Sequence, residues 1–270
     1  MMIDKSEKFG WLVRLGFAAR GLVYILIGYL FLSAPGQNRA DDGPSGAFDY
    51  LQDLPLGAFI LYLCAIGLLA YAFYRLASTF FDVENYGTDT KGIAHRLGHL
   101  GSGVAHLFLA YTAFQFASGT KSTSNGSGGA QEATSTVLSF GVGPVLIGLV
   151  GLALIVAGIM QGKKAITATF MKRVSPGAPR FTRYLGQAGY AARGVVFVLI
   201  GWSLLQSAWF DSSTQLKSLG EAVASLRDNG VLFDIVAAGL LLFGIFSLVM
   251  ARYRIVPDLD PTGKKPMLPA

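Results

Sequence analysis

The sequence predicts an all-α, polytopic membrane protein whose six transmembrane helices form three tandem helix hairpins. Three observations lead to this fold class. Of the 270 residues, 52% are hydrophobic and only 14% are charged, so the chain has too few charges to coat a soluble globule of its size. Apolar stretches of membrane-spanning length recur along the chain, and one sequence motif recurs with them.

The apolar stretches define the predicted helices in chain order. A helix rises about 1.5 Å per residue, so about 20 apolar residues cross a hydrocarbon core about 30 Å thick. Charged residues, or segments rich in Gly, Ser and Pro, separate the stretches from one another. The predicted spans lie at about 12–34, 56–80, 97–117, 141–161, 184–208 and 231–252.

Internal repetition pairs these spans into hairpins. No gap is needed to match LVRLGFAARGLVYILIG (12–28) with LGQAGYAARGVVFVLIG (185–201), and LGHLGSGVAHLFLAYTA (97–113) fits the same frame more loosely. Each copy holds two spans, so it begins and ends on the same membrane face and the three copies are parallel. We therefore predict a single membrane domain over residues 1–270, with repeats at about 9–82, 95–171 and 183–254.

The distribution of Lys and Arg predicts the topology. Basic residues are concentrated around 1–14, 75–96, 163–183 and 252–265. The alternate loops hold only Arg39, Lys121, Lys217 and Arg227. Since cytoplasmic loops carry the excess of Lys and Arg, both termini are predicted to be cytoplasmic.

The first and third repeats share the motif Gly-[Phe/Tyr]-Ala-Ala-Arg-Gly, at 16–21 and 189–194. The helix pair that carries this motif and occurs three times resembles the bacterial membrane family catalogued as domain of unknown function 1206. The likeness covers essentially the whole chain. It implies a multi-pass protein of the bacterial inner (cytoplasmic) membrane, and the family supplies no established activity.

Arg20 and Arg193 stand at the same position of this motif, inside predicted spans. A cation there costs about 2.5–3.5 kcal/mol on insertion scales, so another interaction must offset the cost. Three explanations are open: the side chains snorkel to lipid phosphates, they bond across the bundle, or they form a site for an anion or a lipid head group. His106, in the third span, is the other candidate for such a site.

The three histidines of the chain, His95, His99 and His106, share one face of the third predicted helix, within about 40° at 100° per residue. His95 and His99 are candidate ligands for a divalent metal, because imidazole suits zinc and similar ions. The preceding loop offers further ligands in Asp82, Glu84 and Asp89. Alternatively His95 and His99 are interfacial and His106 donates a packing hydrogen bond. We predict no cofactor.

The sequence favours a non-enzymatic membrane component that interacts with the lipid bilayer, and with membrane-protein partners or further copies of itself. No zincin, Gly-rich phosphate loop, GxSxG or dinucleotide motif is present, so we predict no enzyme. The net charge of +6 does not indicate nucleic acid, because the basic residues lie between apolar runs. One alternative is a small-solute or anion transporter with a site between the repeats, lined by Arg20, Arg193 and His106. Another is a metal- or haem-binding protein that uses the histidine face.

Overall fold

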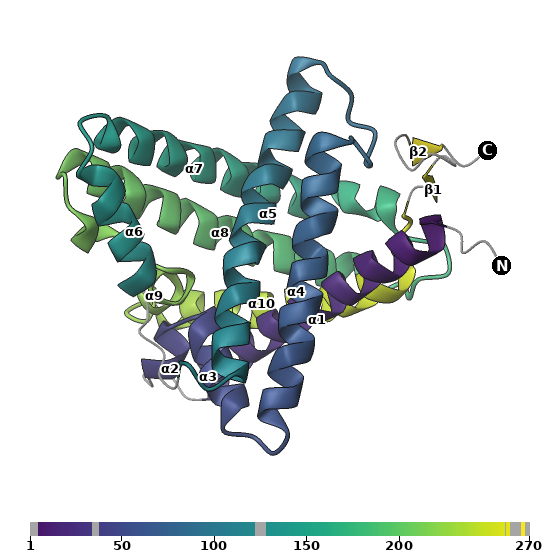
Figure 1. Cartoon of the computed structure of the whole chain (residues 1–270), viewed down its shortest axis with the longest axis horizontal. Helices are drawn as coiled ribbons and strands as arrows, with labels where there is room; N and C mark the ends of the chain where they lie inside the picture. Colours follow the sequence, from purple (N-terminus) through teal and green to yellow (C-terminus); the bar gives the residue numbers. More distant parts are fainter. Residues whose placement is uncertain (1–4, 34–37, 122–127, 257, 260–265, 268–270) are drawn as a thin grey trace.

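All six predicted apolar stretches form long helices. The computed structural model describes residues 5–33, 38–121, 128–256, 258–259 and 266–267. The long helices are α1 (Lys5–Ser33), α4 (Gly57–Phe80), α5 (Thr90–Ala117), α7 (Gly143–Thr167), α8 (Thr182–Trp209) and α10 (Gly230–Tyr253) (Figure 1). Shorter elements connect them: α2 (Asn38–Asp41), α3 (Pro44–Gln52), α6 (Gly128–Leu138), η1 (Thr169–Arg173), η2 (Ser213–Gln215) and α9 (Leu219–Ala224).

The structure confirms the prediction of a helical membrane protein with a tandem repeat. Five helices are long and apolar enough to cross a membrane: α1 over Glu7–Ser33, α4, α7, α8 and α10. α5 is not among them, since its 28 residues carry all three histidines together with Lys91 and Arg96. The described residues also include a pair of two-residue antiparallel strands, β1 (Asp258–Leu259) and β2 (Pro266–Met267), and an isolated bridge between Val174 and Arg254.

Local sequence signals explain where several helices begin. The Asp89 side chain accepts a hydrogen bond from the Gly92 amide and so caps α5. Asn229 caps α10 in the same way by accepting from the Leu232 amide. Pro144 occupies the first turn of α7, where its missing N–H leaves no bond unmade.

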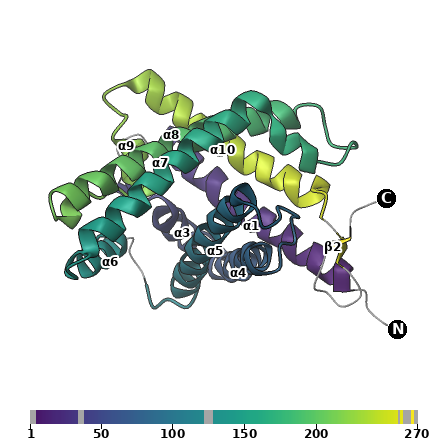
Figure 2. The same ribbon diagram turned by 90° about the horizontal axis from the view of Figure 1, so that it is seen from above.

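The six long helices form a ring that is open at one place. Five pairs of neighbours pack against each other: α5 with α4, α4 with α1, α1 with α10, α10 with α8, and α8 with α7 (Figures 1 and 2). Within the described chain, α5 and α7 do not pack on each other in a comparable way. The hairpins of the first and third repeats are therefore closed, whereas the predicted hairpin of the middle repeat is spread apart.

Glycine contacts explain why α7 packs on the third repeat. A Cβ added to Gly158 would lie 2.8 Å from the carbonyl oxygen of Gly194, and one added to Gly151 would lie 2.8 Å from that of Gly201. Close backbone approach of this kind is a main source of helix association in lipid. α7 therefore gains more from α8 than from its own hairpin partner.

The two outer repeats pack in the same way. A Cβ on Gly67 would lie 2.5 Å from the Ala19 Cβ, and one on Gly239 would lie 2.5 Å from the Ala192 Cβ. These are matching positions of the first and third repeats, so the internal sequence match reflects matched helix contacts.

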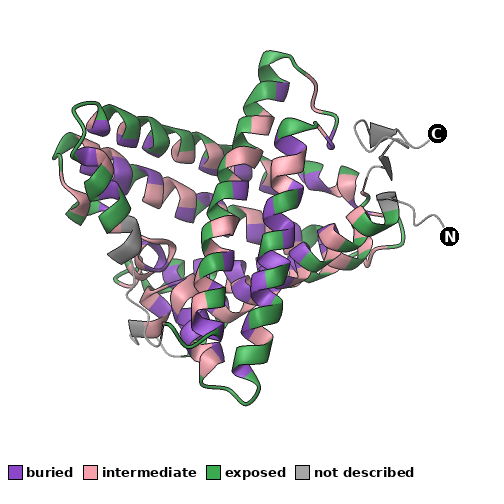
Figure 3. Ribbon diagram, in the orientation of Figure 1, coloured by how far each residue is buried: buried purple, intermediate pink, exposed green. Residues whose placement is uncertain are grey.

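The outward faces of the helices are apolar. Buried residues line the inner faces and exposed residues the outer ones (Figure 3). The exposed side chains include Phe108 at 68%, Ile159 at 64% and Trp202 at 58% exposure. A soluble monomer rarely exposes so much continuous apolar surface, whereas a bilayer solvates it.

Candidate functional site

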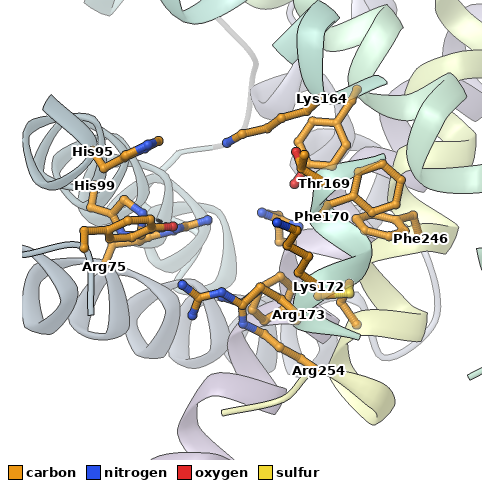
Figure 4. Close-up of a pocket in the computed structure, with 15 residues that line it drawn as sticks. Arg75, His95, His99, Lys164, Thr169, Phe170, Lys172, Arg173, Phe246 and Arg254 are labelled. Carbon is orange, nitrogen blue, oxygen red and sulfur yellow. Dashed lines mark hydrogen bonds between the residues drawn. The ribbon is translucent and has the colours of Figure 1, made fainter. Parts of the chain in front are cut away.

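A cavity of about 240 Å³ lies at the end of the bundle where α4, α7 and α10 finish (Figure 4). Its aromatic and apolar lining residues are Phe17, Tyr86, Phe170, Tyr190, Phe246 and Met250, and its uncharged polar ones are His95, His99 and Thr169. The remaining lining residues are cations: Arg20, Arg75, Lys164, Lys172, Arg173 and Arg254. No carboxylate belongs to the described lining. The cavity is therefore strongly basic.

Directly behind the cavity wall, Glu84 is the counter-ion for two of these cations. Its side chain has no exposed surface and forms ion pairs with Arg173 and Arg254. The Tyr74 hydroxyl donates to the same carboxylate, and Arg173 Nη2 donates to the Glu84 backbone oxygen at 2.8 Å. Burial by itself would lower the pKa of Arg254, but the Glu84 carboxylate outweighs it and the pKa is raised.

This ion cluster joins the three repeats. Glu84 follows α4, Arg173 ends the η1 segment after α7, and Arg254 follows α10. Each therefore comes a few residues after the second helix of its repeat. One acid neutralises one unit of charge, so the cluster as a whole keeps a net charge of +1 beside the cavity.

Arg20 and Arg75 have no acidic partner among the described residues. Arg20 is 5% exposed, donates through Nη1 to the Tyr71 hydroxyl and through Nη2 to Ser247 Oγ at 2.9 Å. Arg75 donates to the same Tyr71 hydroxyl, and its Nη1 lies 3.3 Å from His99 Nδ1. Two guanidiniums thus share one hydroxyl, and no described carboxylate balances their charge.

Aromatic rings offset part of that charge. The Arg20 guanidinium carbon lies 4.7 Å from the Phe17 ring centre and 4.9 Å from those of Tyr71 and Phe243. Each such contact contributes about 0.5–2 kcal/mol. The cost of burying an unpaired ion is several kcal/mol, so the rings alone do not balance it.

The two arginines at the opposite end of the bundle, Arg39 and Arg227, are paired with acids. Arg39 bonds to Asp53 and Asp49, and Arg227 Nη1 donates to Asp41 at 2.9 Å. The hydrogen bond to Asp53 raises the pKa of Arg39, and that to Asp41 raises the pKa of Arg227. The fold therefore provides acids for both arginines at that end, whereas Arg20 and Arg75 in the cavity have none among the described residues.

Arg193, the repeat equivalent of Arg20, is not part of the cavity wall. Its guanidinium carbon lies 4.5 Å from the ring centre of Phe243 and 4.9 Å from that of Phe197, and no described residue forms a hydrogen bond with it. The two arginines differ because the second helices of their repeats differ. When segments 67–76 and 239–248 are aligned, Phe243 corresponds to Tyr71 and Ser247 corresponds to Arg75. The third repeat thus lacks the phenol and the second arginine.

The structure divides the three histidines between two environments. His95 and His99 line the cavity, and the His95 ring stacks on Tyr86 at 4.6 Å between ring centres. His106 is not in the described lining; its Nδ1 lies 2.7 Å from the Ser102 carbonyl oxygen, so that nitrogen is the donor.

The predicted metal site lacks a third ligand in the described part of the chain, where no group of three or more His, Cys, Asp or Glu could hold an ion. The loop acids have other partners. Asp82 accepts from the amides of Tyr86 and Gly87, Asp89 caps α5, and Glu84 binds the two arginines. A metal at His95 and His99 stays a prediction without support from a further side chain.

Sequence reasoning singled out Arg20 as a candidate and missed its neighbours Arg75, Lys164, Arg173 and Arg254. Their signal was present in the Lys- and Arg-rich segments, which were used only to assign topology.

Such a group of guanidinium and ammonium side chains is suited to phosphate, because Arg donates in a planar fork and Lys acts as a point charge. Burial raises the pKa of Tyr86, with Glu84 adding to the effect, so its phenol stays a neutral donor.

Comparison with known proteins agrees with this architecture. The family described as Domain of Unknown Function (DUF1206) matches residues 15–82, 97–168 and 188–254, which correspond to the three repeats. The chain is similar to the uncharacterized protein YxxB of Bacillus subtilis (strain 168), at 32% identity over 264 residues that cover 93% of this chain and 94% of that protein. No solved structure matches the chain. The chain therefore belongs to the DUF1206 family of membrane proteins, to which no function is assigned.

Proposed function

We propose that this protein is a non-enzymatic component of the bacterial cytoplasmic membrane that binds an anionic, phosphate-bearing ligand in the basic cavity. The observation that carries the proposal is the sharing of the Tyr71 hydroxyl by Arg20 and Arg75 while no described carboxylate pairs with either. A bound anion would supply the missing counter-charge. Charge-assisted hydrogen bonds to it would repay the cost of keeping two guanidiniums in a site shielded from water.

The cavity also suits a phosphate by size and by the arrangement of its donors. Its volume of about 240 Å³ is many times what one water molecule needs. Lys164 and Lys172 face Arg75 across the cavity (Figure 4). A tetrahedral anion has acceptor oxygens in several directions, so it can bond to cations on opposite walls at once.

The proposal includes the topology predicted from sequence. We place six spans in the membrane, with α5 as the sixth because it packs along α4, and both termini in the cytoplasm as one membrane domain. The cavity then opens at the cytoplasmic end. The bilayer is the primary partner, and its anionic lipids are most abundant on that side.

Binding is favoured over passage of a solute across the membrane. A transporter needs a polar path beyond Arg20, but the fully buried Phe243 ring lies between Arg20 and Arg193, 4.9 and 4.5 Å from their guanidinium carbons. The aromatic filling of the bundle centre therefore supports a closed-ended site.

Two adjacent lysines provide a matched test. Lys164 lines the cavity and Lys163, its exposed neighbour, does not. Purified protein in detergent would be titrated with pyrophosphate by calorimetry. We expect Lys164→Gln and Arg75→Gln each to weaken binding by about tenfold or more, and Lys163→Gln to change it by less than about twofold. Absence of pyrophosphate binding, or equal effects of the two lysine variants, would contradict the proposal.

A further inference from the structure

We infer that the ligand is an anionic phospholipid, which places its head group in the basic cavity and its acyl chains between α5 and α7. This inference rests on the proposed anion-binding function and names the ligand class. It starts from the opening in the ring of helices. Among the described residues, α5 and α7 lack contacts like those that join the other five pairs of neighbouring helices.

The opening leads into the cavity. His95 and His99 on α5 and Lys164 on α7 lie on opposite walls (Figure 4). The two helices that are not packed on each other therefore both border the cavity. A molecule already in the bilayer can reach the cations from the side, without passing through the bundle.

Small, exposed residues border the histidine face of α5. Gly98 follows His95 by three positions and Ala105 lies seven further on, so both border the histidine face. Both are exposed, and a Cβ added to Gly98 would meet no atom within 4 Å. There is room here for a hydrocarbon chain.

The α7 side of the opening is apolar. Met160 precedes Lys164 by one helical turn and is 41% exposed, and Ala153 lies on the same side two turns earlier. Cations at the predicted cytoplasmic end therefore give way to apolar surface toward the membrane interior. This order, from cations at the interface to apolar surface inside the membrane, matches an anionic phospholipid, whose phosphate lies at the interface and whose acyl chains extend inward. A free anion would use only the cations.

The test compares ligands that share a head group. Purified protein in detergent would be titrated with phosphatidylglycerol in mixed micelles, with phosphatidylcholine in the same micelles, and with glycerol phosphate in solution. We expect phosphatidylglycerol to bind at least about tenfold more tightly than either of the other two. Arg75→Gln should weaken the binding of phosphatidylglycerol and of glycerol phosphate alike.

Variants that block the space between α5 and α7 test the contribution of the acyl chains separately from that of the head group. Gly98→Trp, with Ala105→Trp as a second variant, should weaken phosphatidylglycerol binding by about tenfold and leave glycerol phosphate within about twofold. Leu97→Trp is the matched control, because Leu97 is 60% exposed at the same depth and lies about 100° away around α5. Thermal unfolding checks that each variant is folded.

The outcomes distinguish the two proposals. If glycerol phosphate binds and depends on Arg75, but phosphatidylglycerol binds no more tightly or is unaffected by both tryptophan variants, the lipid inference is wrong and the anion site stands. If neither ligand binds, both proposals are wrong.

Discussion

Replacing Glu84 with glutamine gives two opposite effects that follow from one change of charge. The Glu84 carboxylate is fully buried and forms ion pairs with Arg173 and Arg254, whose side chains are 31% and 11% exposed. Removing one partner of a buried ion pair costs about 3–5 kcal/mol, because the other charge stays buried. Arg173 keeps part of its hydration, so we expect the lower end of that range, about 3 kcal/mol.

The loss of stability is measured by thermal unfolding in detergent. A cost of about 3 kcal/mol lowers the melting temperature by roughly 6–12 °C in a chain of this size. Glu132→Gln makes the same chemical change at an exposed position and should leave the melting temperature within about 2 °C.

The second effect concerns anion binding. Glu84→Gln raises the cavity charge by one unit, which strengthens the attraction for an anion about 8 Å away by about 1–2 kcal/mol, or roughly five- to thirtyfold. Pyrophosphate at about 100 times its dissociation constant stabilises the folded state by about 2.7 kcal/mol, so it should restore most of the lost stability. A variant as stable as the natural chain, or one that binds pyrophosphate more weakly while still folded, would refute the reasoning.

Three further predictions follow from the packing and the topology. Tyr71→Phe removes the hydroxyl that accepts from two arginines and should lower the free energy of unfolding by about 1–3 kcal/mol. Tyr62→Phe, at an exposed site on the same helix, should lower it by less than about 0.5 kcal/mol. Equal effects of the two changes would contradict the shared hydrogen bonds. Gly239→Ala puts a Cβ 2.5 Å from a neighbouring Cβ and should destabilise by about 1–3 kcal/mol, and an unchanged melting temperature would show that the two helices are farther apart. In a background without the native cysteine, Asp228→Cys should react with an impermeant maleimide in intact cells and Lys172→Cys only after permeabilisation; the reverse result would invert the topology.

The helices and their repetition could be predicted from sequence because both depend on local pattern. The stretches predicted at 56–80 and 231–252 correspond to α4 at Gly57–Phe80 and α10 at Gly230–Tyr253. Length and hydropathy locate the ends of a span to within a few residues. An ungapped match between two segments predicts that their helices make similar contacts. These constraints need no knowledge of which helices are neighbours.

The site could not be predicted in the same way, because it depends on contacts between distant segments. Glu84 and Arg254 are 170 residues apart, and each lies in a segment without helical periodicity. In the sequence, the difference between Arg20 and Arg193 appears as two mismatches between the second helices, Tyr71 against Phe243 and Arg75 against Ser247. Its meaning became clear once the structure placed both arginines beside these rings.

The separation of α5 from α7 was also outside the reach of the sequence. The internal repetition pairs consecutive spans, so the sequence predicts that the middle repeat forms a hairpin like the others. The glycine contacts between α7 and α8 favour a different neighbour. Such preferences depend on matching of shape between helices rather than on the pattern within one of them.

A density map of the purified protein in nanodiscs that contain phosphatidylglycerol would show whether the cavity holds an anion. Our account predicts density for a bound anionic group within about 3 Å of the Arg20 and Arg75 guanidiniums, inside the cavity that Lys164 completes. A map in which the cavity holds only water, or in which a protein carboxylate pairs with Arg20 and Arg75, would contradict it.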